Sequence, residues 1–285
     1  MQIVDDFNDY KLINTSSGYK KEIWGKYTLL RPDPAIIWKD NSDFSCDAKY
    51  VRSKSGGGSW EIYNNIPESW KINYKNYSFN IKLMGFKHTG LFPEQAYNWN
   101  YLDKVIKDSK RKDIKVLNLF AYTGAASVAC LSAGASVVHV DSSRGMVDWA
   151  KENVKSSQLE DRPIRYIVDD VVKFVKREIR RGNKYDIILM DPPSFGRGSS
   201  GEVWDIEKDL FNLVELSEQL LSDKALLFLI NSYTTGLSTT TLENILNMII
   251  VKKRKGTIVS DELGIKQSNS NIILPCGNFA RWENK

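Results

Sequence analysis

From Ile114 onward, short apolar runs alternate with segments whose apolar residues recur every three or four positions. The apolar runs are rich in Val, Ile and Leu, as buried strands are, and the segments between them have helical spacing. We therefore predict strands at residues 116–120, 137–140, 164–168, 185–190 and 225–230. Because helices that alternate with buried strands cover both faces of a parallel sheet, the pattern predicts a doubly wound α/β fold.

The first third of the chain has a different pattern. Five of the eight tryptophans precede residue 100, and short stretches of alternating polarity are separated by turn residues. We predict strands at residues 27–31 and 35–38, and a hairpin with strands at 70–74 and 77–83. The change in pattern divides the chain into a small β-rich N-terminal subdomain, residues 1–90, and an α/β domain, residues 91–285.

The composition is that of an ordinary folded protein, with 42% hydrophobic and 26% charged residues among 285. No apolar run approaches the roughly 20 residues of a membrane helix, and the N-terminus lacks the features of a secretion signal, so we expect a cytoplasmic protein. The net charge of +5 permits a nucleic-acid partner without requiring one. Three separated cysteines and two histidines have no metal-ligand spacing, and we expect no metal site.

Candidate chemistry lies directly after the predicted strands, where ligands bind in doubly wound sheets. The first strand is followed by Phe120–Ser127, in which Gly124 allows close approach of a ligand to the backbone. Asp141 follows the second strand, and its carboxylate can accept hydrogen bonds from two ribose hydroxyls. Asp169 and Asp170 follow the third strand, and Asp191 follows the fourth. Polar residues directly after four successive strands predict a ligand site at this edge of the sheet.

The turn around Gly124 limits the ligand class. A dinucleotide site needs the pattern G-x-G-x-x-G and a Walker loop needs G-x-x-x-x-G-K-[ST], and neither occurs in this turn. A nucleoside without phosphates fits the turn, and S-adenosylmethionine is such a molecule. Its carboxylate can meet the helix start, its ribose Asp141, and its adenine the corner at residues 168–170.

The chain resembles the class I S-adenosylmethionine-dependent methyltransferases, and more closely the bacterial branch of large-subunit ribosomal RNA methyltransferases. The resemblance covers about residues 86 to 235. It depends on the segments Thr89–Gln95, Asn118–Gly124, Asp141–Ser142, Trp149–Asn153 and Asp191–Phe195.

This resemblance implies a Rossmann-like methyltransferase fold with a mostly parallel seven-stranded sheet, and S-adenosylmethionine as cofactor. It implies a catalytic corner at Asp191, Pro192 and Pro193. The implied cofactor contacts are Phe92, Gln95, Asn118, Phe120, Ala121, Tyr122, Thr123, Gly124, Asp141, Ser142, Asp169, Asp170 and Asp191.

The resemblance also bears on mechanism. Relatives that methylate carbon 5 of cytosine use a cysteine after the fifth strand, and the matching stretch here, Asn231–Gly236, has none. Cys130 lies mid-helix and is best explained as a small buried residue. We therefore expect direct in-line transfer to a nitrogen or oxygen, with Asp191 as the group that orients or accepts a proton. Ser194 stands where amino-methylating relatives carry an aromatic residue, which Phe195 follows.

We expect a methyltransferase that acts on RNA, most simply ribosomal RNA. Alternatives are the same chemistry on a small molecule or protein, a non-catalytic module that binds the cofactor and RNA, and an NAD-type oxidoreductase. Structural interpretations also stand: Gly124 can make a tight helix–sheet contact, Asp141 can share a helix-cap role with Ser142, and Asp169 or Asp170 can cap the helix at Val171. The glycine-rich loop 196–201 is either a connection or a lid over the substrate. The sequence leaves the oligomeric state open.

Overall fold

The computed structural model describes residues 1–40, 43–53, 57–198 and 201–284, and the chain folds into two compact units. The sheet unit comprises Met1, residues 98–263 and residues 277–285. The β-rich unit comprises residues 2–97 and 264–276. The first stretch of the β-rich unit ends seven residues beyond the boundary expected at residue 90, and residues 264–276 join that unit from the far end of the sequence.

The largest sheet has eight strands in the order β1-β16-β17-β15-β12-β9-β10-β11. β9, β10, β11, β12 and β15 are parallel, and β17 runs antiparallel to β15. The mostly parallel α/β fold is confirmed, and the short β1 adds one strand to the seven expected. The strands are β1 (Gln2–Ile3), β9 (Lys115–Leu119), β10 (Ser136–Asp141), β11 (Ile164–Val168), β12 (Ile187–Met190), β15 (Leu227–Ser232), β16 (Thr257–Lys266) and β17 (Ile273–Glu283).

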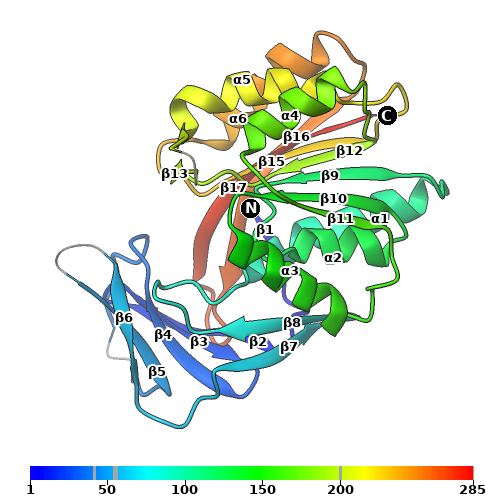
Figure 1. Cartoon of the computed structure of the whole chain (residues 1–285). Coiled ribbons are helices and arrows are strands. Elements are labelled where there is room, and N and C mark those ends of the chain that lie inside the picture. Colours follow the sequence, from blue (N-terminus) through cyan, green and yellow to red (C-terminus); the bar gives the residue numbers. More distant parts are fainter. Residues whose placement is uncertain (41–42, 54–56, 199–200, 285) are drawn as a thin grey trace. The chain divides into compact units, whose positions relative to one another are not determined.

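Helices cover both faces of this sheet. Figure 1 shows α4, α5 and α6 over one face and α1, α2 and α3 over the other, which confirms the doubly wound arrangement. No helix in the part of the chain described here is long and apolar enough to cross a membrane. The helices are α1 (Ala96–Asp108), α2 (Ala125–Ser132), α3 (Arg144–Ser156), α4 (Val171–Arg180), α5 (Ile206–Glu218), α6 (Thr239–Leu246), the 3-10 helix η1 (Pro93–Gln95) and the π-helix η2 (Asn247–Val251).

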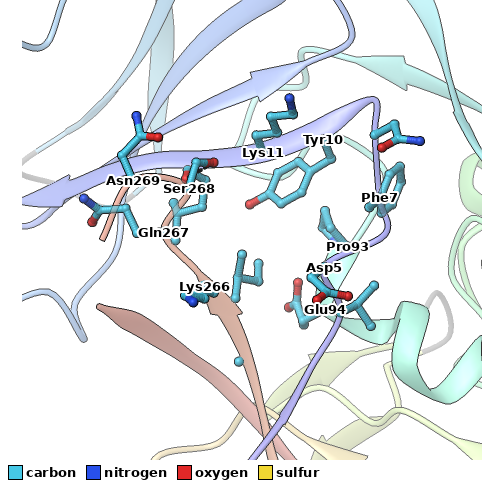
Figure 2. Close-up of a pocket in the computed structure, with 15 residues that line it drawn as sticks. Asp5, Phe7, Tyr10, Lys11, Pro93, Glu94, Lys266, Gln267, Ser268 and Asn269 are labelled. Atoms are coloured by element: carbon cyan, nitrogen blue, oxygen red, sulfur yellow. Dashed lines mark hydrogen bonds between the residues drawn. The ribbon is translucent and has the colours of Figure 1, made fainter. Parts of the chain in front are cut away.

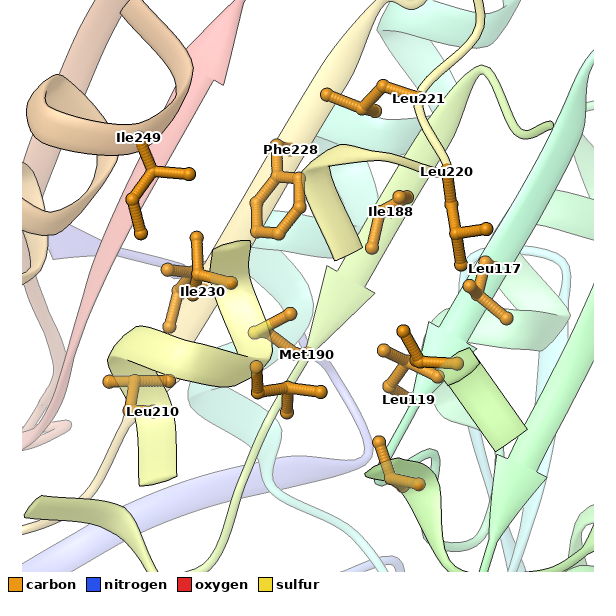
Figure 3. Packing of buried hydrophobic residues seen from close by; sticks show 14 of the residues in the cluster. Leu117, Leu119, Ile188, Met190, Leu210, Leu220, Leu221, Phe228, Ile230 and Ile249 are labelled. Atoms are coloured by element: carbon orange, nitrogen blue, oxygen red, sulfur yellow. The ribbon is translucent and has the colours of Figure 1, made fainter. Parts of the chain in front are cut away.

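The face beneath α4, α5 and α6 carries a continuous apolar core. Alternate residues of each strand point to the same face. Consequently every second residue of the strands β9, β12 and β15 enters this core. The strand residues between them are also buried, as expected for strands covered by helices on two sides. Figure 3 shows the side chains that meet in this layer, among them Leu117, Leu119, Ile188, Met190, Leu210, Leu220, Phe228, Ile230 and Ile249.

The β-rich unit contains a five-stranded sheet and a separate hairpin. The predicted hairpin is confirmed, with Trp70 opposite Ile81 and Tyr74 opposite Tyr77. The predicted strand at 35–38 is wrong, because the Asp33 carboxylate accepts the N–H of Ala35 and holds a turn there. The strands are β2 (Tyr10–Ser16), β3 (Tyr19–Trp24), β4 (Tyr27–Pro32), β5 (Ala48–Arg52) and β6 (Gly58–Ile62) in the sheet, and β7 (Ser69–Tyr74) and β8 (Tyr77–Lys82) in the hairpin.

A charged pair lies inside the β-rich unit. The Glu22 carboxylate is fully buried and accepts two hydrogen bonds from the Arg31 guanidinium, at 2.6 and 2.7 Å, and one from the Tyr10 hydroxyl at 2.8 Å. Burial acts to raise the pKa of Glu22, but the cations of Arg31 and Lys20 outweigh it and lower the pKa below its ordinary value. Glu22 is therefore ionised and depends on Arg31 for its charge compensation.

We expect Arg31→Met to reduce the free energy of unfolding of the β-rich unit by about 3–5 kcal/mol, because it leaves the Glu22 charge buried without a partner. Urea denaturation followed by tryptophan fluorescence measures this loss. The matched control is Lys75→Met, which removes a cation of the half-exposed Lys75–Asp6 pair in the same unit and should cost less than about 1 kcal/mol. Equal losses in the two variants would contradict the assignment of the buried pair.

Candidate active site

The strand ends predicted to carry chemistry lie next to one another in the sheet. Leu119 is the register partner of both Val140 and Met190, and Asp141 is the partner of Val168. The residues that follow β9, β10, β11 and β12 consequently meet at one edge. The structure thus brings the turn around Gly124, the carboxylates after β10 and β11, and Asp191 to neighbouring positions of the sheet unit.

The turn after β9 has an unusual backbone. Phe120, Tyr122 and Gly124 have φ angles of 53°, 51° and 83°, so three residues of five occupy the left-handed region. Gly124 is the N-cap of α2 and provides no side-chain hydrogen bond to it. The first N–H groups of that helix therefore have no side-chain cap and can face an anionic group.

Gly124 also has a packing role. A Cβ at this position would lie 2.9 Å from the Cβ of Ala150 on α3 and 3.4 Å from Cε1 of His139. Gly124 therefore lies close to the helix α3 and, at His139, to the strand β10. Because the backbone conformation and the contact with α3 both favour glycine, this residue fixes how near α2 and α3 approach each other.

The Asp141 carboxylate joins two segments of the edge. Oδ2 accepts the N–H of Tyr122 and Oδ1 accepts the N–H of Ser143, both at 2.9 Å. Burial raises the pKa of this carboxyl, although the two backbone donors act in the opposite direction. Asp141 is only partly buried, and each oxygen keeps a second lone pair that can accept a hydrogen bond from a ligand.

The helix caps differ in part from the expected ones. Ser143, and not Ser142, caps α3, since its hydroxyl accepts the N–H of Met146. Asp170 caps α4 by accepting the N–H of Lys173 at 2.8 Å. Asp169 instead pairs with Arg177 and receives the N–H of Asp170. Of the two aspartates after β11, Asp170 therefore has the capping role that the sequence left open.

A buried polar chain supports the glycine turn from below. Asn118 Nδ2 donates to Ser127 Oγ at 3.0 Å, and Ser127 Oγ lies 3.0 Å from His139 Nδ1. Asn153 Nδ2 donates to the carbonyl oxygen of Thr123 at 2.8 Å. These side chains are buried and support the backbone of the turn. Polar residues within otherwise apolar runs are the signal by which these side chains could have been found.

Asp191 begins a rigid corner after β12. Its N–H donates to Leu119 O at 3.4 Å, and the next residue, Pro192, is buried. Trp204 Nε1 donates to Pro193 O at 2.7 Å, and its ring lies 4.9 Å from that of Phe120. The corner is thereby connected to the glycine turn through one tryptophan.

A short hairpin follows the double proline. Its strands are β13 (Phe195–Arg197) and β14 (Val203–Asp205), and residues 199–200 of the predicted loop lie outside the described residues. Phe195 is 56% exposed, and the Ser194 hydroxyl lies 2.7 Å from that of Thr234. The aromatic side chain at this corner is thus presented to solvent, one position later than in the amino-methylating pattern.

Two predicted cofactor contacts, Phe92 and Gln95, belong to the β-rich unit, and their role stays a prediction. The other predicted contacts belong to the sheet unit. In the described part of the chain, no three His, Cys, Asp or Glu side chains gather as a metal would require.

Comparison with known proteins identifies the family. The sequence model of the S-adenosylmethionine-dependent methyltransferase family matches residues 35–247 of this chain. This chain belongs to that family. The crystal structure of the methyltransferase from Agrobacterium tumefaciens is 35% identical with a TM-score of 0.94, and the match covers 99% of this chain and 93% of that one. The predicted enzyme class and the predicted cofactor, S-adenosylmethionine, are confirmed.

The methyltransferase also resembles longer curated proteins. It is 30% identical over 187 residues to the ribosomal RNA large subunit methyltransferase K/L of Syntrophotalea carbinolica, a match over 65% of this chain and 25% of that protein. The protein of the same name from Pseudoalteromonas atlantica is 39% identical over 162 residues, which cover 56% of this chain and 22% of that protein. The chain therefore spans about a quarter of the length of these relatives.

The methyltransferase has two histidines, and we expect neither to titrate near neutral pH. Burial lowers the pKa of both His88 and His139 to about 4. In the unfolded chain a histidine protonates near pH 6.5. Burial of the two neutral imidazoles therefore contributes its full stability above that pH, and this contribution is lost as the pH falls toward 4. For His139 the loss is about 3 kcal/mol.

Proton NMR of the two imidazole Cε1–H resonances measures both midpoints, and urea unfolding at several pH values measures the stability. The His139→Asn variant should show a smaller loss of stability between pH 6.5 and 4.5 than the parent chain does. A histidine midpoint above pH 6 would contradict the buried, neutral assignment.

Proposed function

We propose that this methyltransferase transfers a methyl group to RNA, with ribosomal RNA as the substrate. The observation that carries the proposal is the 30–39% identity to proteins named ribosomal RNA large subunit methyltransferases. The net charge of +5 is compatible with a polyanionic substrate. A ribosomal RNA substrate would place the activity in the cytoplasm, as the sequence analysis expects.

S-adenosylmethionine fits the residues at the edge of the sheet unit. The uncapped start of α2 suits its carboxylate, and the remaining lone pairs of Asp141 suit its ribose hydroxyls. Asp169, whose N–H donates to Asp141 O at 3.1 Å, stands beside that position and suits the adenine. When bound, the cofactor supplies a methyl group on a positively charged sulfur.

The chain's own residues favour direct transfer. Burial raises the pKa of the Cys130 thiol, and it raises that of Cys276 well above the ordinary value, so neither favours the thiolate that nucleophilic attack requires. In this proposal Asp191 orients the acceptor group and accepts its proton, while Pro192 and Pro193 keep the corner rigid. The exposed Phe195 ring provides a stacking surface for an unpaired base.

We expect Asp141→Ala to weaken binding of S-adenosylhomocysteine by about 1–3 kcal/mol, because two hydrogen bonds to a charged acceptor are lost. Isothermal titration calorimetry measures this change, and thermal unfolding shows whether the variant remains folded. The matched control is Asp148→Ala, which removes an exposed carboxylate from the neighbouring α3. Equal affinity in the Asp141 variant and the parent chain would remove Asp141 from the ribose position.

The substrate is tested with tritium-labelled S-adenosylmethionine and ribosomal RNA from cells that lack the protein. We expect label in RNA, and we expect Asp191→Ala to lower turnover about a hundredfold or more while cofactor affinity changes little. Nucleoside mass spectrometry then identifies the methylated atom. Label in protein or small molecules, with none in RNA, would contradict the RNA assignment.

A further inference from the structure

The β-rich unit contains a cavity of about 450 Å³, and none of its lining residues is a predicted cofactor contact. Its walls come from three stretches of that unit, residues 4–12, Pro93–Glu94 and residues 264–269. This volume lies within the range of about 300–1,000 Å³ that small-ligand sites have. The cavity is therefore large enough for one planar heterocycle of a nucleotide.

The walls are held in place by hydrogen bonds. Ser268 N–H donates to Leu12 O at 2.8 Å, and Thr15 Oγ1 donates to Gln267 Oε1 at 3.0 Å. Oε1 of Gln267 is engaged in this bond, and the amide nitrogen carries the hydrogen-bond donors of this side chain. Gln267 is 8% exposed, so this donor is a built feature of the wall and not a mobile surface side chain.

Acceptors line another part of the same cavity. Figure 2 shows Asp5 and Glu94 together on one side, and Gln267, Ser268 and Asn269 together on another. The Tyr10 hydroxyl donates its proton to the ionised Glu22 behind the wall, which leaves its oxygen only as an acceptor. Asp5 and Glu94 thus place carboxylate oxygens on one side of the cavity, and the Gln267 amide lies on another.

The remaining lining suits the faces of a flat, uncharged ring. Two acids, Asp5 and Glu94, balance two bases, Lys11 and Lys266, so the lining does not select a strongly charged group. Phe7 and Pro93 add apolar surface, and the Phe7 ring packs 4.7 Å from that of Tyr74. A ring with apolar faces and a polar edge matches this combination.

We propose that this cavity binds one unstacked nucleobase of the RNA substrate, and that it prefers a base with an exocyclic amino group. The amino N–H groups would donate to the carboxylate side, and ring or carbonyl acceptors would face the Gln267 amide. This inference rests on the proposed RNA function, because single-stranded bases are what proteins accept in such pockets.

Cytosine and uracil provide the matched test, because cytosine carries an amino group where uracil carries a carbonyl. Fluorescence anisotropy with oligocytidine and oligouridine of eight nucleotides should show about tenfold tighter binding of oligocytidine. Glu94→Gln should abolish this preference and raise the KM for RNA. The control Glu68→Gln, an exposed carboxylate of the same unit, should leave the preference intact.

Ultraviolet cross-linking of oligocytidine locates the contact. After trypsin digestion, the nucleotide should be attached to the peptides 1–11 or 267–281, which carry two of the cavity walls. Cross-links confined to other peptides, or an unchanged preference in Glu94→Gln, would overturn the proposal. Tighter binding of free cytidine monophosphate than of the oligonucleotide would also overturn it, in favour of a small-molecule site.

The two proposals fail in different ways. If no RNA is methylated, the proposed function fails, whatever the cross-links show. If ribosomal RNA is methylated but the cavity neither cross-links nor discriminates, the nucleobase site alone fails.

Discussion

The Asp141 carboxylate is the interaction on which the candidate active site depends. It accepts the N–H of Tyr122 from the glycine turn and the N–H of Ser143 from the start of α3. Tyr122 lies 19 residues from Asp141 in sequence and Ser143 lies two residues from it, so one side chain fixes the relative positions of these two segments. Without it, the two backbone N–H groups would need other partners, and the left-handed backbone at Phe120 and Tyr122 would lose its support.

The site is rigid because its supports are packed side chains on regular elements. Gly124 allows α2 to contact α3 at Ala150, and the chain from Asn118 through Ser127 to His139 fills the polar space beneath the turn. Trp204 extends this support to the double-proline corner. A neutral buried histidine suits such a position, because it provides a hydrogen-bonding group without the energy required to bury a charge.

The β-rich unit also depends on buried polar groups. Its core contains the charged pair of Glu22 and Arg31, and Tyr10 connects that pair to the wall of the cavity. The proton of Tyr10 is committed to Glu22, so the buried pair leaves the Tyr10 oxygen as a hydrogen-bond acceptor. In both units, then, buried polar groups set the chemistry that the surface presents to a ligand.

The sequence by itself determined the alternation of strands and helices, since hydrophobic periodicity reflects burial on one or two faces. It also located Gly124, Asp141 and Asp191, because residues after parallel strands share one edge. Only the tertiary structure decided that residues 264–276 join the β-rich unit, that Ser143 and Asp170 are the caps, and that 35–38 forms no strand. The hydrogen-bonded chain around His139 and the cavity beside Tyr10 join residues far apart in sequence. Local pattern holds no information on such pairings, because they arise when separate elements pack together.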